Sequence, residues 1–524
     1  MQLNTKFINV IERNTTFDSE GFIDLVNLLS CPLLSYANYA LNRKDKHDLF
    51  NTLFLGKTHS VASRLEEVLD YYNSKNNQQW RPFREHVAAI KVFTDVAYIT
   101  LHLKSASPQY KLLSGIDLFL KETDEIMDTF ALTLCTVFQE LIKISKKNGL
   151  KRCSDIDKEV SFSIDFPQGR LDSDLKKHSI DNPEQVIVNL ATSYLNLASE
   201  SEVLYQIESA NSKNYEELVP NVVNENKIRI LENKFHNLQS LYDTYISNTD
   251  IEDLDNDLRL IRGHASIVYH LLEASTNVIH YYERHIMKLP GSKEHLTKSP
   301  LKGKKVLKML VDYYLNYTGQ FLTAGVNLCK DVIKKYAEEG SVAVKVPSYR
   351  GFHVRPSTLV SKIVQHYGSD VYLVMGDDKY NASLPMELFR VNEKINAEKR
   401  RNLANSICSL HSVNDPECNN NYSKGLKEVF HELLEENKII NYASEFSLPD
   451  LTSINEETLG EFANRAIAYL LAQGKIDLKT DLKVHFEGDK RVLADLEVLA
   501  NCGYGEDCYG NNIVLPKELS YLRR

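Results

Sequence analysis

One stretch decides the fold of this chain: Val342-Ala343-Val344-Lys345-Val346-Pro347-Ser348-Tyr349-Arg350-Gly351-Phe352-His353-Val354-Arg355-Pro356-Ser357-Thr358-Leu359. The valines at its start alternate with other residues, which predicts a half-buried β-strand. A Pro-Ser-Tyr-Arg-Gly turn follows, and Pro356 stands where the first turn of a helix is expected. From Leu359 onward, apolar residues recur at helical spacing. His353 is therefore expected in a loop immediately before a helix N-terminus.

This position favours an anion beside His353. Unpaired backbone N–H groups and the positive end of the helix dipole attract negative charge, and Arg355 adds a permanent cation. A neutral imidazole at such a place can accept a phosphoryl group and hold it as phosphohistidine. Backbone N–H groups near Arg355 and Ser357 are candidate donors to the phosphoryl oxygens, with the Ser357 hydroxyl as a cap or further ligand. Arg355, Pro356 and Ser357 are thus the predicted phosphate-binding residues.

The segment Gly351-Phe352-His353-Val354-Arg355-Pro356 resembles the active-site signature of HPr, the histidine phosphocarrier of the phosphoenolpyruvate-dependent phosphotransferase system. The resemblance implies that His353 carries the phosphoryl group on Nδ1 and that Arg355 neutralises phosphoryl charge during transfer. It also implies an Enzyme I-like protein as the phosphoryl donor.

The chain continues as an HPr-like domain would. Residues 369–375 predict a strand, 376–378 a turn, 379–383 a returning strand and 384–389 a short helix. The last strand and helix of such a domain appear only at 482–488 and 489–499. An HPr-like open-faced sandwich is therefore predicted in two parts, 341–390 and 481–524, separated by a helical insertion at 391–480.

Three features depart from the HPr pattern. Leu384 and Pro385 stand where many HPr proteins carry a regulatory serine, and Ser383 comes one place early. Pro385 and Glu387 alter the helix that docks Enzyme I in the family. The insertion leaves from the end of that helix, with helices predicted at 395–410, 426–434 and 459–471 and an Asn-rich loop at 414–421. It is expected to cap the docking face, to replace it with a surface for another partner, or to lie beside it.

Helical periodicity dominates the chain before this domain. Amphipathic patterns predict a helical bundle at 1–155 and a second helical region at 156–340, divided near an irregular stretch at 162–169. The predicted fold class is mostly α, with N-terminal helical bundles followed by a C-terminal α+β domain.

Two His–Glu pairs, His270 with Glu273 and His280 with Glu283, share faces of one predicted helix. Metal binding is one interpretation, and hydrogen-bonded histidines are the other. The order is the reverse of the Glu-before-His motif of bundle metal sites, so no metal site is predicted.

Composition narrows the function classes. The net charge of −9 over 524 residues argues against generic nucleic-acid binding. Eight cysteines without a Cys-x-x-Cys pair indicate neither a zinc site nor a disulfide framework. The N-terminus lacks signal-peptide character, and the best apolar run, 129–138, is too short to span a bilayer. A cytoplasmic protein is expected, without cofactor, metal, nucleic acid or membrane insertion.

The leading hypothesis is a phosphocarrier or phosphorylation-dependent regulator, and not a turnover enzyme. It would accept a phosphoryl group on His353 from an Enzyme I-like donor and act on a protein acceptor or regulatory target. One alternative is a non-catalytic interaction protein with an HPr-like docking domain, and another is a helical enzyme regulated by that domain. A His353 open to solvent favours phosphotransfer, whereas one covered by the insertion favours the docking domain.

Overall fold

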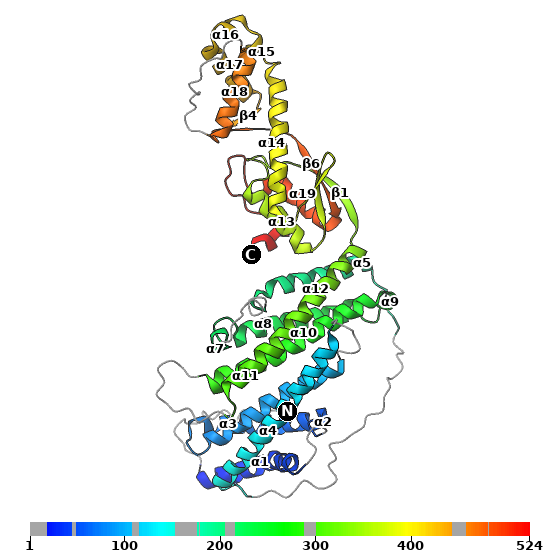
Figure 1. The fold of residues 1–524 in the computed structure, drawn as a ribbon, viewed down its shortest axis with the longest axis vertical. Helices are drawn as coiled ribbons and strands as arrows, with labels where there is room; N and C mark the ends of the chain where they lie inside the picture. Colours follow the sequence, from blue (N-terminus) through cyan, green and yellow to red (C-terminus); the bar gives the residue numbers. More distant parts are fainter. Residues whose placement is uncertain are drawn as a thin grey trace, which may run out of the picture. The chain divides into compact units, whose positions relative to one another are not determined.

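The structure is a computed structural model that describes residues 18–43, 49–106, 115–151, 176–177, 179–204, 215–287, 300–442, 457–479 and 481–523. These residues are mostly helical, with a small antiparallel sheet of four strands in the C-terminal region (Figure 1). This confirms the prediction of a mainly helical chain with strands near its C-terminal end.

The chain divides into two compact units. The first contains residues up to Val186 together with Leu197–Cys329, and the second contains Ile187–Asn196 and Lys330–Arg524. The helical regions predicted at 1–155 and 156–340 therefore belong mainly to one unit. Their predicted boundary and the irregular stretch at 162–169 lie outside the described residues.

The first unit is built from long amphipathic helices: α1 (Ser19–Asn42), α2 (Thr52–Tyr71), α3 (Arg81–Ala106), α4 (Ile116–Lys147), α8 (Glu225–Tyr245) and α10 (Asn256–Tyr281). Shorter segments are η1 (Ser74–Asn76), α7 (Tyr215–Leu218), α9 (Asp250–Leu254), η3 (Tyr282–Ile286), α11 (Gly303–Met309) and η4 (Leu310–Leu315). Two more helices, α5 (Pro183–Glu200) and α12 (Asn316–Tyr336), contribute residues to both units. Within the first unit, α3 packs against α2, α4 and α10, and α10 packs against α8.

Local sequence explains where these helices begin and which face they bury. The side chains of Asn51 and Asn224 cap α2 and α8 by accepting the backbone N–H groups of Phe54 and Lys227. The inner face of α4 buries large aromatic side chains, including Phe119 and Phe138. Each is worth roughly 1.5–3 kcal/mol of burial free energy, which outweighs the helix propensity of any single residue.

The four-stranded sheet belongs to the second unit. Its strands are β1 (Glu339–Lys345), β2 (Val371–Met375), β3 (Asp378–Asn381) and β6 (Lys483–Asp489), in the antiparallel order β1-β6-β2-β3. Each coincides with one of the four strands predicted from the sequence. The distant strand β6 is inserted between β1 and β2, so residues that are over a hundred positions apart pair directly, as Val344 does with Val484.

One face of this sheet is covered and the other is open. Val344, Phe486 and Leu373 are buried, whereas Lys345 and His485, on the opposite face, are exposed. Helix α19 (Lys490–Asn501) packs on β1 and β6, and α13 (Val354–Tyr367) packs beside α19 and α14. A short helical segment, η5 (Gly503–Gly505), and a last one, η6 (Lys517–Arg523), pack against α13 and α19.

Helix α14 (Pro385–Ile407) does not end where the sequence analysis divides the domain from the insertion. It runs for 23 residues without a break at 390/391. The reason is an uninterrupted helical stripe of buried residues, in which Val391 and Ile395 enter the core under the sheet and Leu403 and Ile407 enter a second core in the insertion. Neither glycine nor proline follows Pro385 in this helix.

The sequence predicted a helical insertion, whereas the structure has strands there as well as helices. It contains α15 (His411–Asn414), α16 (Pro416–Asn420), α17 (Tyr422–Glu435) and α18 (Leu459–Ala472), with a two-stranded antiparallel sheet of β4 (Ile439–Asn441) and β5 (Ile476–Leu478). The Asn-rich stretch 414–421 is mainly the short helix α16, capped by Asp415. These strands have only 3 residues each, too few for an alternating pattern to stand out in the sequence.

A buried ion pair joins β6 to α19. Asp489 caps the helix by accepting the backbone N–H of Arg491, and its carboxylate binds the Arg491 guanidinium at 2.6 Å and the Ser369 hydroxyl at 2.5 Å. The Asp489 side chain is 2% exposed. Burial opposes its ionisation, but the hydrogen bonds from Arg491 and Ser369 outweigh burial and hold its pKa below the usual carboxyl value.

We predict that Asp489→Asn lowers the free energy of unfolding of the β6–α19 part of the four-stranded sheet by about 3 kcal/mol, because Arg491 is left without its anionic partner. The measurement is hydrogen exchange of β6 and α19 peptides of the full chain in increasing urea. Because the folded-state pKa is lowered, the ion pair stabilises above the ordinary carboxyl pKa and is lost as pH falls through the lowered value. The loss of stability caused by Asp489→Asn should therefore be smaller at acid pH. Asp481→Asn is the control, since this carboxylate is 96% exposed, and an equal deficit in both variants would contradict the prediction.

Candidate functional site

The loop between β1 and α13 carries His353 and has a left-handed turn at its centre. Arg350 and Gly351 have φ values of +51° and +62°. A Cβ atom on Gly351 would lie 2.1 Å from Oδ1 of Asn392, so the close approach as well as the backbone conformation requires glycine there. The turn therefore depends on contacts from outside the loop.

Two side chains supply these contacts. Asn392 of α14 accepts the Phe352 backbone N–H at 2.9 Å and donates to the Arg350 carbonyl at 3.0 Å. Asp477 of β5 accepts the Arg350 backbone N–H at 2.7 Å, and its other oxygen accepts the Leu478 backbone N–H. The insertion thus helps to hold the loop that presents His353.

His353 directly precedes α13, as expected, and it, not Ser357, occupies the N-cap position. Its Nε2 atom lies 2.7 Å from Oε1 of Glu506, whose side chain is 3% exposed. An ionised carboxylate can only accept, so in the neutral tautomer that pairs with it Nε2 carries the proton and Nδ1 has the lone pair. Among the described residues, Nδ1 has no hydrogen-bond partner. The Tyr349 ring packs against the imidazole at nearly a right angle, with the ring centroids 5.4 Å apart.

The helix start beside His353 offers free donors, which include the predicted Arg355 N–H but not the Ser357 N–H. The backbone N–H groups of Val354 and Arg355 have no acceptor among the described residues, as expected for the first turn of a helix. The Ser357 N–H instead donates to the His353 carbonyl, and the Ser357 hydroxyl donates to the Phe352 carbonyl. Pro356 is buried and has no N–H. Ser357 and Pro356 therefore shape the helix start, while Val354 and Arg355 present the donors.

The Arg355 side chain is directed to the C-terminal segment. Its Nη1 donates to Oδ1 of Asn512, and its buried Nε has no partner among the described residues. Glu506 and Asn512 are themselves joined by a β-bridge. The same short segment therefore holds both His353 and Arg355.

Sequence reasoning missed Glu506, Asn512 and the two residues that hold the turn. Glu506 is 153 positions from His353 and sits in a glycine-containing turn with no periodic pattern to place it. Asn392 and Asp477 are polar residues inside a predicted insertion, and nothing in their local sequence connects them to the loop. Contacts between elements that are distant in the sequence bring these residues to the loop: α14 packs on α13 and β5 packs on α14, while β6 pairs with β1.

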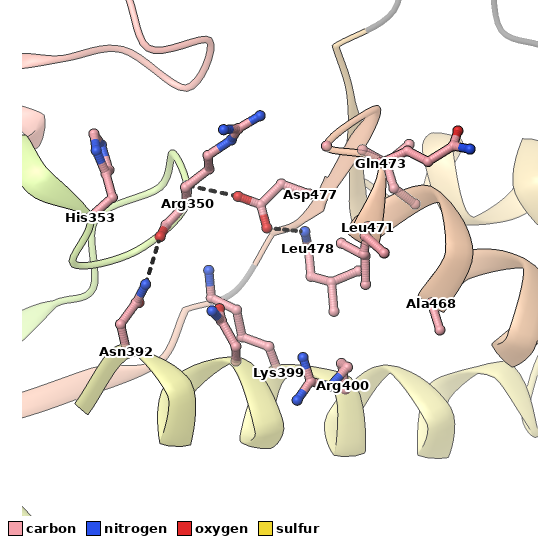
Figure 2. A pocket seen from close by; sticks show the side chains of 14 residues that line it. Arg350, His353, Asn392, Lys399, Arg400, Ala468, Leu471, Gln473, Asp477 and Leu478 are labelled. Carbon is pink, nitrogen blue, oxygen red and sulfur yellow. Dashed lines mark hydrogen bonds between the residues drawn. The ribbon is translucent and has the colours of Figure 1, made fainter. Parts of the chain in front are cut away.

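A pocket of about 710 Å³ lies between the His353 loop and the insertion (Figure 2). Arg350 and His353 line one side, Asn392, Lys399 and Arg400 of α14 line the floor, and Ala468, Leu471 and Leu478 line the far wall. The His353 side chain is 27% exposed. The insertion therefore approaches His353 without burying it.

The histidines of the two predicted His–Glu pairs are hydrogen-bonded to carboxylates of the first unit. His270 Nδ1 pairs with Glu273, and His280 Nδ1 pairs with Glu225. The buried His264 contacts the Phe321 carbonyl, and burial lowers its pKa to about 4. Within the described ranges, no three His, Cys, Asp or Glu side chains are grouped to share a metal ion.

Comparison of the chain with models of protein families, with curated proteins and with solved structures finds no match. Across the part of the chain that the structure describes, no helix combines the length and hydropathy needed to cross a membrane.

We predict that Asn392→Ala speeds amide exchange at Phe352 by about thirtyfold, since two hydrogen bonds of about 1 kcal/mol each are lost from the turn. Hydrogen exchange of peptides spanning residues 346–356 measures this change. Asn402→Ala, at an exposed position of the same helix, is the matched control. Unchanged exchange at Phe352 would show that the turn does not need Asn392.

Proposed function

We infer that this chain is a phosphocarrier or phosphorylation-dependent regulator that accepts a phosphoryl group on Nδ1 of His353. The observation that carries the proposal is the contact between Nε2 of His353 and the buried Glu506 carboxylate at 2.7 Å. It leaves the Nδ1 lone pair as the nucleophile at the N-terminus of α13. No metal or cofactor is required for this step.

The transfer follows from the atoms at this site. The Nδ1 lone pair attacks the phosphorus of the donor's phosphohistidine, a new N–P bond forms at His353, and the donor's N–P bond breaks. The electron pair of the broken bond returns to the donor imidazole. Positive charge develops on the His353 ring and is stabilised by Glu506, while the backbone N–H groups of Val354 and Arg355 meet the phosphoryl oxygens.

The identity of the donor rests on the resemblance to HPr. The order strand–helix–strand–strand–helix–strand–helix, formed by β1, α13, β2, β3, α14, β6 and α19, supports an HPr-like open-faced sandwich interrupted by an insertion. An Enzyme I-like protein is accordingly the proposed donor, in the cytoplasm, and the acceptor or regulatory target is another protein.

A protein donor also needs a surface on which to dock. Val354 at the start of α13 is 68% exposed, and Leu384 and Met386 at the start of α14 are 50% and 69% exposed. Because α13 and α14 pack against each other, these apolar side chains offer a docking surface close to His353. The insertion leaves them uncovered.

The decisive experiment is phosphoryl transfer in vitro. The full chain is incubated with phosphoenolpyruvate and Enzyme I from the same organism, and its intact mass is measured. We predict a gain of one acid-labile phosphate that is absent from His353→Ala. No gain in a folded sample would reject the carrier function and favour a non-catalytic docking domain.

A second prediction concerns the orienting carboxylate. Glu506→Gln should slow single-turnover phosphorylation by about tenfold, because a neutral hydrogen bond replaces a charge-assisted one worth about 1–2 kcal/mol more. Glu518→Gln, an exposed change in the same C-terminal segment, should leave the rate unchanged. The ¹⁵N shifts of the His353 ring test the mechanism directly, since Glu506 is expected to hold the Nε2–H tautomer. A wild-type ring protonated on Nδ1 would contradict this role.

A further inference from the structure

We propose that the pocket between the His353 loop, α14 and the α18–β5 segment binds a small phosphate-bearing organic molecule, a phosphomonoester, through Lys399. This ligand site goes beyond phosphoryl acceptance, and its occupancy does not require His353 to react.

Lys399 is a buried lysine whose amino group has no hydrogen-bonded counterion among the described residues. It is 3% exposed, and its Nζ has no hydrogen-bond partner among the described residues. It occupies the same stripe of α14 as Ile395 and Leu403, at the junction of the two apolar cores. Burying an unpaired ammonium group is strongly unfavourable. An apolar residue would fit this stripe better, so the lysine calls for a ligand in the pocket that it lines.

The charges around Lys399 are mainly positive. Arg350 and Arg400 line the same pocket, and both are exposed to it. Among the described residues that line the pocket, the one carboxylate is that of Asp477, whose oxygens already accept the backbone N–H groups of Arg350 and Leu478. Burial lowers the pKa of Lys399, and the Asp477 charge only partly opposes this shift. A dianionic phosphate would supply the charge and the acceptors that Lys399 lacks.

The size and lining of the pocket indicate a ligand larger than an inorganic ion. A volume of about 710 Å³ is within the range of small-molecule sites and much larger than one phosphate needs. Ala468, Leu471 and Leu478 form an apolar wall opposite the Arg350 loop, and Figure 2 shows Lys399 on α14 between the two sides. The phosphate is therefore expected at Lys399 and Arg350, and the organic part against the apolar wall.

The pocket is also lined by the residues that hold the loop carrying His353. Asn392 and Asp477 line the pocket and clamp the Arg350–Phe352 turn. A bound phosphomonoester would contact the same loop, so it is placed to affect how His353 is presented.

Isothermal titration calorimetry of the full chain with phenyl phosphate, phenol and inorganic phosphate tests the proposal. Phenyl phosphate should bind one site with a Kd below about 1 mM, tighter than inorganic phosphate, and phenol should not bind. Lys399→Met should weaken binding at least about tenfold and Arg400→Met by less. Arg401→Met is the matched control, because Arg401 is the next residue of the helix, is 71% exposed and pairs with Glu398. It should bind as the unaltered chain does.

A stability measurement separates ligand binding from a structural role of Lys399. Without ligand, Lys399→Met should slow hydrogen exchange in α14, because it removes an unpaired buried charge. A lysine needed for folding would give faster exchange. Absence of phenyl phosphate binding to the unaltered chain, or equal binding by the Lys399→Met and Arg401→Met variants, would overturn the proposal. Enzyme I is absent from these assays, so their outcome is independent of phosphoryl acceptance.

Discussion

The arrangement around His353 depends on the hydrogen bonds by which Asn392 and Asp477 hold the left-handed turn before it. Arg350 has a φ of +51°, a conformation that is unfavourable for a residue with a side chain. It is held because Asn392 bonds both sides of Gly351 and Asp477 binds the Arg350 N–H. Both anchors come from segments far along the chain, so the loop and the insertion are parts of one structure.

The second constraint is the contact between Glu506 and His353. A buried carboxylate hydrogen-bonded to one ring nitrogen fixes the orientation of the imidazole and leaves its other nitrogen without a partner among the described residues. The C-terminal segment that supplies Glu506 also binds Arg355 through Asn512. Residues that follow α19 thus contact the loop before α13 through both His353 and Arg355.

The continuity of α14 links the loop that carries His353 to the pocket. One helix carries Asn392, which holds the loop, and Lys399, which lies seven residues further along at the pocket floor. If α14 had ended at residue 390, the insertion would have shared no helix with the part of the chain that holds the His353 loop. Because it continues, the insertion builds a cationic site against the loop, and a stripe that is otherwise apolar contains a lysine. That lysine is detectable in the sequence as a charge at a core position, although its pocket is not.

The sequence by itself determined the mainly helical character, the four strands of the sheet and the position of His353 before a helix, because these follow from local periodicity and turn residues. It could not determine the short strands β4 and β5, since a three-residue strand has no readable period. Only the tertiary structure decided that Ser357 turns inward and that Glu506, Asn392 and Asp477 meet at the loop. The physical reason is that hydrogen bonds between distant segments depend on strand order, and strand order leaves no mark on local sequence.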